Sequence, residues 1–377
     1  MYTGELPTPA LLIDLEILER NLAFMQGRSK TLGVALRPHI KTHKCIEIAE
    51  RQLKKGASGI TVSPFYEAEQ FAAAGFNDIT WALPIPPVYA TKVLQFSDAV
   101  KLSVVIDSTE AKGHLDKVCR TMGKRLHVWL KVDCGYHRAG VDPGSKHAEH
   151  LAQSLADSRV LVFEGILSHS GHSYHARSRN EILPYAREER DTMVEFAEKL
   201  RSKGINIPAV SVGSTPAMVV VDHLNGVSEM RPGNYAFYDF TQAMIGSCTV
   251  ADCALTVLAS VISHQPGSSH FVTDAGALAL SKDVGPTHVK NQMGMGSIYE
   301  DYDRKRLYPH LELTTLSQEH GKVTADAARF IKEKFAVGEK VRILEHHSCL
   351  TAAQFDHYYV VKGDEVVHEW KILRGWA

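Results

Sequence analysis

Short apolar segments alternate with amphipathic helical segments from residue 34 to residue 233. The predicted strands cover residues 34–40, 59–62, 78–83, 100–106, 127–133, 160–168, 209–213 and 227–232. Helical periodicity covers residues 64–74, 87–96, 109–121, 146–156 and 181–203. Eight strands separated by helices in about 200 residues favour a closed (β/α)8 barrel of the TIM type over an open doubly wound sheet. No Gly-x-Gly-x-x-Gly follows the first strand, which disfavours a dinucleotide-binding fold.

The pattern changes beyond Tyr235, where β-like segments dominate. They cover residues 254–263, 270–274, 311–314, 341–344, 357–361 and 365–372, and residues 10–14 are also strand-like. A helical pattern occurs at 326–333, and the polar, glycine-containing stretch 282–309 predicts a long loop. We therefore expect two domains, a barrel over residues 20–240 and a mostly β domain made of residues 1–19 and 241–377.

Composition narrows the class of protein. The chain of 377 residues is 44% apolar and 23% charged, as in ordinary globular proteins, and its net charge of −1 gives no electrostatic case for nucleic acid or an acidic membrane surface. The six cysteines are scattered without the spacing of a disulfide framework. The N-terminus has no basic region followed by an apolar run, and no segment has the roughly 20 apolar residues of a membrane span. We expect a cytoplasmic protein with free thiols.

The first predicted strand ends in an unusual group of basic residues, Arg37 to Lys44. If residues 34–41 are extended, Arg37, His39 and Lys41 share one face, and Lys41 lies furthest towards the C-terminal end. A lysine among other cations has its ammonium form disfavoured, which favours an amine able to form a Schiff base. A solvated basic loop is the alternative, and it would be favoured for an isolated cluster of this kind.

The barrel hypothesis predicts that polar, reactive residues follow the C-terminal ends of the strands. The sequence agrees, with Lys41, Ser63, Asp107, residues 133–138, residues 169–174, Ser214, Thr215 and Asn234 in those places. Gly213, Ser214 and Thr215 after the seventh strand, with Gly233 and Asn234 after the eighth, predict one anion site of the kind that binds a phosphate. Two ordinary turns are the alternative for either segment alone.

Two further loops carry candidate residues. Arg138, between glycines after the fifth strand, could reach the barrel axis and donate to a ring nitrogen or a carboxylate; the alternative is a surface salt bridge. Tyr174, after the sixth strand, could pack on or bond to a ring cofactor, or simply pack in its loop. The histidines of that loop, including His169 and His172, give weak support for a metal site because no acidic or sulfur partner accompanies them, and they stay unassigned.

The last motif is His347-Ser348-Cys349 in the C-terminal part. At positions i and i+2 of an extended segment, His347 and Cys349 would lie on one face, and imidazole with thiolate is a pair that prefers zinc. Two protein ligands leave positions for water or substrate, which suits a catalytic site. A buried free cysteine beside a polar histidine is the alternative.

Six segments together are similar to one enzyme family. They are Arg-Pro-His-Ile-Lys-Thr-His-Lys at 37–44, Lys-Val-Asp-Cys-Gly-Tyr-His-Arg-Ala-Gly-Val at 131–141, Ser-Val-Gly-Ser-Thr-Pro at 211–216, Arg-Pro-Gly-Asn-Tyr at 231–235, Gln-Glu-His-Gly at 318–321 and His-Ser-Cys at 347–349. The chain resembles the D-serine dehydratase and D-threonine aldolase family, which comprises fold-type III, alanine racemase-like enzymes that use pyridoxal 5′-phosphate (PLP) and a divalent metal. The resemblance spans essentially the whole chain.

The resemblance implies roles for the candidate residues. Lys41 would bind PLP covalently, Arg138 would face the pyridine nitrogen, and Tyr174 would contact the cofactor. The phosphate would lie against Gly213, Ser214, Thr215, Gly233 and Asn234. His347 and Cys349 would bind the metal, most simply zinc, with manganese or magnesium as alternatives. Roles for His39, Glu319 and His320 stay open.

The resemblance also implies an activity. The aldolase branch typically carries His-x-Asp at the last motif, so His-x-Cys points to the dehydratase branch, acting on D-serine or 3-hydroxy-D-aspartate to give a keto acid and ammonia. The alternatives are a D-threonine or 3-hydroxy-D-amino-acid aldolase, an amino-acid racemase, and a non-catalytic PLP-binding protein. A homodimer acting on small D-amino acids, without nucleic acid or membrane partners, is expected.

Overall fold

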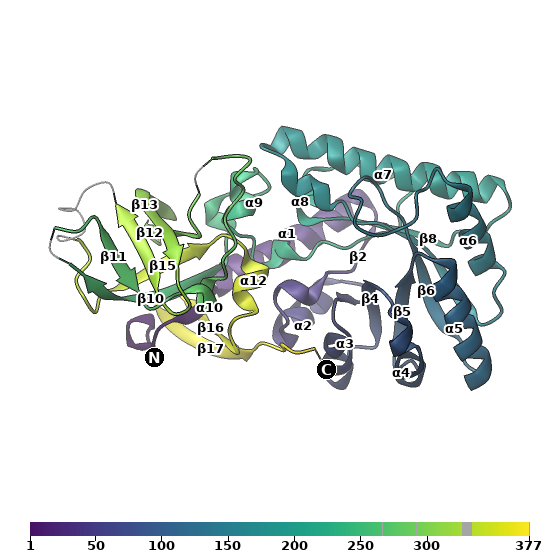
Figure 1. Ribbon diagram of the computed structural model, residues 1–377, viewed down its shortest axis with the longest axis horizontal. Coiled ribbons are helices and arrows are strands. Elements are labelled where there is room, and N and C mark those ends of the chain that lie inside the picture. Colours follow the sequence, from purple (N-terminus) through teal and green to yellow (C-terminus); the bar gives the residue numbers. More distant parts are fainter. Residues whose placement is uncertain (266, 292, 326–333, 377) are drawn as a thin grey trace.

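The computed structural model describes residues 1–265, 267–291, 293–325 and 334–376. Two sheets lie side by side along the long axis of the molecule, a parallel sheet surrounded by helices and an antiparallel sheet of mostly C-terminal strands (Figure 1). The predicted helix at 326–333 lies outside the described residues. All six cysteines are free, as expected from their spacing.

The parallel sheet has eight strands in the order β2-β9-β8-β7-β6-β5-β4-β3. They are β2 (Ala35–Leu36), β3 (Ile60–Val62), β4 (Asp78–Pro84), β5 (Lys101–Ile106), β6 (Leu126–Lys131), β7 (Leu161–Leu167), β8 (Ala209–Val212) and β9 (Glu229–Met230). The two edge strands meet, since Ser58 N donates to Leu36 O (2.8 Å), Thr61 N donates to Pro38 O (2.9 Å), and His39 forms a parallel bridge with Thr61. The sheet therefore closes into the predicted eight-stranded barrel.

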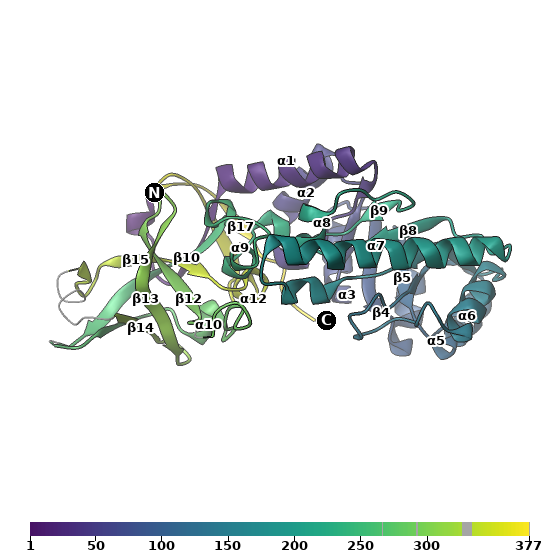
Figure 2. The same ribbon diagram turned by 90° about the horizontal axis from the view of Figure 1, so that it is seen from above.

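Helices cover the outside of the barrel (Figures 1 and 2). They are α1 (Leu15–Leu32), α2 (Ile46–Lys55), α3 (Phe65–Ala73), α4 (Ala90–Phe96), α5 (Thr109–Met122), α6 (Lys146–Ala156), α7 (Arg179–Ser202) and α8 (Thr215–Val220), with the 3-10 turn η3 (Pro87–Tyr89) before α4. Serine caps start α5 and α6, where the side chains of Ser108 and Ser145 accept backbone N–H groups. The sequence pattern missed α1, which buries Asn21, Gln26 and Ser29 beside its apolar residues, so its hydrophobic stripe is weak.

Buried polar side chains connect the barrel strands from inside. Arg37 Nε donates to Glu229 Oε2 (2.6 Å), and Ser211 Oγ donates to Glu229 Oε1 (2.6 Å). Arg231 donates through Nε to Ser211 Oγ (2.7 Å) and through Nη2 to Ser168 O. These bonds join β2, β9, β8 and the end of β7, and they hold the strand ends that carry the candidate site in one arrangement.

The antiparallel sheet has the order β11-β14-β13-β12-β15-β10-β1-β16-β17, and an additional pairing of β10 with β11 closes part of it into a small barrel. Its strands are β1 (Ala10–Asp14), β10 (Leu255–His264), β11 (His270–Thr273), β12 (Gly296–Asp301), β13 (Arg306–Leu316), β14 (Gly321–Ala325), β15 (Lys340–Glu345), β16 (His357–Lys362) and β17 (Glu365–Lys371). The N-terminal strand β1 lies between β10 and β16, so the N-terminal segment joins the C-terminal domain, as predicted. The short turn η1 (Thr3–Glu5) precedes β1 in the chain, and η6 (Val250–Asp252) precedes β10.

The stretch 282–309 was predicted as one long loop, and this prediction is wrong in its second half. Strand β12 and the beginning of β13 lie there, and β12 pairs with both β13 and β15. The register of β12 with β13 shifts between Ser297 and Asp301, so a regular alternation of apolar and polar residues is missing from the sequence. Strand β14 was also not predicted. The boundaries at residues 20 and 240 stay a prediction.

The two sheets meet through short elements and share one hydrophobic core. The helices α9 (Phe240–Met244), α10 (Ala277–Leu280) and α12 (Ser348–Ala352) lie at this junction, with α12 beside the 3-10 turn η2 (Ile40–Thr42). Tyr358 of β16 donates its hydroxyl proton to His43 O (2.7 Å), and Leu373 N donates to Lys44 O (2.7 Å). The C-terminal domain therefore supports the loop that follows the first barrel strand. None of the described helices combines the length and apolar character that crossing a membrane requires.

Candidate active site

Lys41 lies at the end of the barrel that faces the C-terminal domain, but on a turn and not on a strand. The extended conformation predicted for residues 34–41 is correct as far as His39, which bridges Thr61, but wrong beyond it, because Ile40 to Thr42 form η2. Pro38 cannot donate to the strand ladder, and the His39 side chain caps the turn by accepting from Lys41 N (3.4 Å). Lys44 points elsewhere, since its ammonium pairs with the fully buried Glu67.

Positive charge and neutral imidazoles gather around Lys41. Burial, with the charges of Lys41 and Arg231, lowers the pKa of His39 well below its ordinary value. Burial, Lys41 and Lys131 do the same to the pKa of His169, whose Nδ1 bonds Gly213 O (3.0 Å). Burial, followed by Arg231, lowers the pKa of Lys131 to about 7. A net positive environment of this kind suits an anionic group.

Sequence reasoning missed Lys131 and Arg231. Both are buried at strand ends, and each stands in a motif that was quoted only for its neighbours. The available signal was a charged residue directly at the end of an apolar strand, since such a residue is buried only where a partner or a ligand compensates its charge.

Arg138 is exposed on the loop after β6, and its guanidinium lies over the ring of Tyr136 (4.9 Å to the ring centroid). The ring of Tyr136 in turn contacts His169 edge-on, at 6.1 Å between centroids. Arg138 is also one of the charges that lower the pKa values of His169 and Lys131. The structure thus places Arg138 near the same strand ends as Lys41, while its predicted bond to a ring nitrogen stays a prediction.

The predicted anion site is formed by two neighbouring strand ends. Strands β8 and β9 pair directly, and the loops after them are joined by a bond from Tyr235 N to Thr215 Oγ1 (3.1 Å). Gly213 has φ +124°, a conformation that side chains rarely adopt, and a Cβ at Gly233 would lie 2.7 Å from His39 O. Gly213 is therefore required by its backbone conformation and Gly233 by the close approach of the His39 backbone.

Four backbone N–H groups of these loops are free to bind an anion. Within the described part of the chain, Ser214, Thr215, Gly233 and Asn234 donate no hydrogen bond through their backbone nitrogens. The Gly213 amide is different, because it donates to Glu189 Oε1 (3.1 Å). The helix α8 is only six residues long, so loop amides and not a helix dipole would bind a phosphate. Free amides beside a cationic cluster fit the phosphate of PLP.

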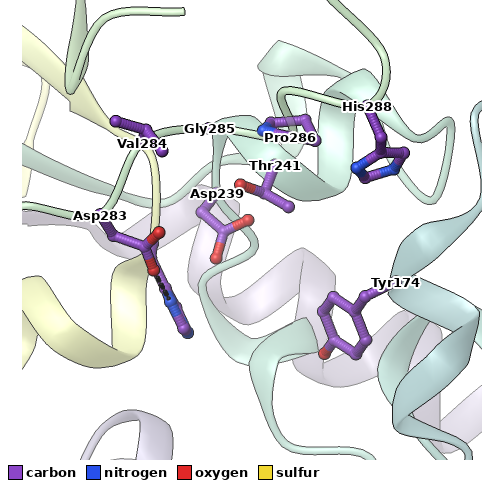
Figure 3. A pocket seen from close by; sticks show the side chains of 9 residues that line it. Tyr174, Asp239, Thr241, Asp283, Val284, Gly285, Pro286 and His288 are labelled. Carbon is purple, nitrogen blue, oxygen red and sulfur yellow. Dashed lines mark hydrogen bonds and ion pairs between the residues drawn. The ribbon is translucent and has the colours of Figure 1, made fainter.

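Tyr174 lines a cleft between the barrel and the C-terminal domain (Figure 3). It belongs to the 3-10 turn η4 (Gly171–His175), and Asp239 and His347 line the same cleft of about 150 Å³. Burial, with the nearby Cys349 and Asp239, raises the pKa of Tyr174, so its hydroxyl stays protonated. The prediction that Tyr174 contacts a cofactor is compatible with this place but is not tested by it.

His347 and Cys349 lie side by side at the start of α12. The predicted extended segment is wrong, since His347 is the last extended residue and Cys349 is already helical. Burial by itself raises the pKa of Cys349, but His347, Lys41 and Thr42 outweigh it and lower the pKa to about 7. Thr42 Oγ1 lies 3.2 Å from Cys349 Sγ, so the turn that carries Lys41 touches the His-x-Cys motif.

The surroundings of this motif fit a metal held by two side chains. Asp283 Oδ2 lies 2.6 Å from His347 Nδ1, which leaves Nε2 of the ring for a metal. No group of three or more His, Cys, Asp or Glu side chains among the described residues could hold a metal. The two-ligand donor set therefore leaves coordination positions for water or substrate, as the sequence predicts.

Three residues keep open roles, of which His172 contacts the Tyr136 ring at 6.2 Å between centroids. His172 is buried, and neither of its ring nitrogens has a hydrogen-bond partner among the described residues. Glu319 and His320 lie on the exposed turn between β13 and β14. None of the three lines the cleft that contains Tyr174.

Family comparisons agree with this architecture. The model of the alanine racemase N-terminal domain matches residues 13–239, and that of a putative serine dehydratase domain matches residues 254–361. D-threo-3-hydroxyaspartate dehydratase of Delftia sp. is 39% identical, with 98% of each chain covered. D-serine dehydratase of Dictyostelium discoideum is 35% identical, covering 99% of this chain and 98% of the relative. D-threonine aldolase of Arthrobacter sp. is 30% identical, covering 98% of this chain and 93% of the relative.

The Delftia dehydratase is also similar as a solved structure. It has a TM-score of 0.95 at 38% identity, with all of both chains covered. Two solved variants of it replace by alanine a histidine and a cysteine that are two residues apart, and the cysteine variant is described as a metal-free form. His347 and Cys349 have the same residue types and the same spacing.

Proposed function

We propose that this chain is a PLP- and divalent-metal-dependent lyase of β-hydroxy D-amino acids. The premise is its family, since the chain belongs to the family that joins an alanine racemase N-terminal domain to a serine dehydratase domain. The preferred reaction is dehydration of D-serine or 3-hydroxy-D-aspartate to a keto acid and ammonia. One observation carries the proposal: Thr42 of the Lys41 turn touches Cys349, so the turn that carries the amine adjoins the His-x-Cys motif.

The residues of the barrel half would bind the cofactor and move the proton. Lys41 Nζ would anchor PLP and, once released by the incoming substrate, take the proton from Cα as general base. The free amides of Ser214, Thr215, Gly233 and Asn234, next to Gly213, would hold the phosphate. Bound PLP supplies the electron sink for the pair released at Cα. Arg138 would face the pyridine nitrogen, and Tyr174 would contact the ring.

The residues of the C-terminal half would act on the leaving group. His347 and Cys349 would hold the metal, and a thiolate with an imidazole favours zinc over manganese or magnesium. A metal at this place supplies Lewis-acid polarisation of the β-hydroxyl, which makes it a better leaving group. The same polarisation in an aldolase would favour cleavage of the Cα–Cβ bond.

The proposal also covers the setting of the enzyme. We propose a homodimer in the cytoplasm, acting on free D-amino acids without a nucleic-acid or membrane partner. The relatives include both dehydratases and an aldolase, and the cysteine of the His-x-Cys motif favours the dehydratase. The two-domain chain and its metal motif disfavour a racemase, which needs no metal, and a non-catalytic PLP-binding protein.

The test is product analysis with D-serine, D-threonine and 3-hydroxy-D-aspartate, each with and without added zinc or manganese. Metal-dependent pyruvate from D-serine, or oxaloacetate from 3-hydroxy-D-aspartate, is the expected result. Glycine and an aldehyde from D-threonine, without pyruvate from D-serine, would instead assign the chain to the aldolases. Interconversion of D- and L-alanine without added metal would assign it to the racemases.

A further inference from the structure

A carboxylate from outside the predicted motifs reaches the metal half of the site. Asp283 Oδ2 lies 2.6 Å from His347 Nδ1, and both residues line the cleft in which Figure 3 labels Asp283. Asp283 belongs to the segment between α10 and β12, within the stretch 282–309 that was predicted as a long loop. We propose that Asp283 is a positioning residue, which holds the His347 ring by its Nδ1 proton so that Nε2 is presented to the metal shared with Cys349.

The chemistry of histidine ligands supports this role. A neutral imidazole has one protonated and one unprotonated nitrogen, and only the unprotonated nitrogen binds a metal. A carboxylate on Nδ1 fixes the proton there, orients the ring and makes Nε2 a stronger donor. The pair does little for the stability of the fold, because the side chains of His347 and Asp283 are 39% and 36% exposed and exposed ion pairs are screened by water.

The second carboxylate of the cleft is already engaged. Asp239 accepts from Asn234 Nδ2 (2.7 Å), from the backbone N–H of Gln242 (2.9 Å), and from Ser348 through its backbone nitrogen (3.2 Å). These donors connect the loop after β9 with the start of α12. Asp239 therefore fixes the backbone around the motif, whereas Asp283 contacts the imidazole itself.

The backbone around Asp283 is held in place independently of a metal. Ser281 Oγ accepts from Asp283 N (3.3 Å), and Thr351 of α12 donates to Leu280 O (3.2 Å). Further along the same segment, His288 Nε2 donates to Ala176 O (3.0 Å) next to the turn of Tyr174. The segment is thus tied to α12 at one end and to the barrel at the other, so Asp283 is preorganised for His347.

The inference rests on the metal site of the proposed function, and zinc affinity tests it. The purified PLP-containing protein and its variants would be titrated with Zn²⁺ against a chelating dye. Asp283→Ala should weaken zinc binding roughly 10- to 100-fold, which is typical for loss of such a partner, while the visible absorption of PLP is retained. Asp283→Asn should lose less zinc affinity than Asp283→Ala, because the amide oxygen still accepts a hydrogen bond from the Nδ1 proton. Activity of both variants should return at saturating zinc.

A matched control uses another carboxylate opposite a histidine in the same domain. Glu369 Oε1 lies 3.9 Å from His357 Nε2 on β17 and β16, away from the cleft, and Glu369→Gln should leave zinc affinity unchanged. The inference fails if Asp283→Ala binds zinc like the wild type. It also fails if the alanine and asparagine variants lose affinity equally, because Asp283 would then be a metal ligand itself. A wild type that binds no zinc would overturn the inference together with the metal part of the proposed function, whereas the first two results leave that function intact.

Discussion

The two halves of the site are built in different ways. The barrel half uses backbone amides of paired loops, the half-buried imidazoles of His39 and His169, and the buried Arg231, whose guanidinium donates to two neighbouring strand ends. The C-terminal half uses two side chains of one short turn, of which His347 is 39% exposed and oriented by a single carboxylate. Because several contacts hold each group of the barrel half, a single substitution there should change its geometry little. In the C-terminal half, substitution of any one of the few groups should change metal affinity.

The largest expected effect comes from the one residue of the barrel half that has no substitute. Lys41→Ala should lower activity by roughly 10³-fold or more, because it removes both the covalent anchor and the base. It should also abolish the visible absorption of lysine-bound PLP, measured on the purified protein. Lys44→Met is the comparison, since Lys44 pairs with Glu67 and not with the cleft. Loss of the absorption in Lys44→Met but not in Lys41→Ala would move the anchor to Lys44.

The next effect should separate the two halves. Cys349→Ser removes the thiolate ligand, so zinc affinity should fall by at least about 10-fold and activity with it, while PLP stays bound. Metal content and visible absorption, measured on the same sample, check both parts. Chelation of the metal in the wild type should likewise lower activity while PLP stays bound. An activity indifferent to chelators would remove the metal from the mechanism.

A smaller effect concerns the buried charge of the barrel half. Burial and Arg231 lower the pKa of Lys131 to about 7 in the folded protein, against 10.5 for a free lysine. Between these values the unfolded chain holds the proton more than the folded chain does, so stability rises with pH, by up to about 1.4 kcal/mol per pH unit. Lys131→Met should abolish this dependence, measured by denaturant unfolding at pH 7 and pH 9. Substitution of the exposed Lys322 should leave the pH dependence of stability unchanged. If Lys131→Met has the same pH dependence as the wild type, Lys131 is charged when buried.

The smallest effect concerns the support of one half by the other. Tyr358→Phe removes the bond to His43 O in the loop after Lys41, and the free energy of unfolding should fall by about 1 kcal/mol. Tyr359→Phe is the control, because the Tyr359 hydroxyl has no hydrogen-bond partner among the described residues. Equal stability of the two variants would show that this contact between the domains contributes nothing.

Local patterns predicted most of the barrel correctly. Helix α6 begins and ends at the predicted residues, and all eight parallel strands lie where apolar runs were found. The errors share one physical cause, since they occur where tertiary contacts replace a regular pattern. Strand β12 is irregular in register, and α1 buries polar residues against its neighbours.

The candidate residues could be named from motifs, but not their local conformation. Lys41 was expected at the C-terminal end of an extended segment and Cys349 within one, and both lie on helical turns. Lys131 and Arg231 were missed, because burial of a charged side chain depends on the closed barrel around it.

The alternation of strands and helices, the glycines of the predicted anion site and the His-x-Cys spacing can be read from the amino-acid sequence, because they depend on local conformation and residue chemistry. The contacts of Thr42 with Cys349, 307 positions apart, and of Asp283 with His347 are visible only in the folded chain. The reason is physical: periodicity reports which side of an element is buried, whereas contacts between distant segments follow from barrel closure and the packing of the two sheets.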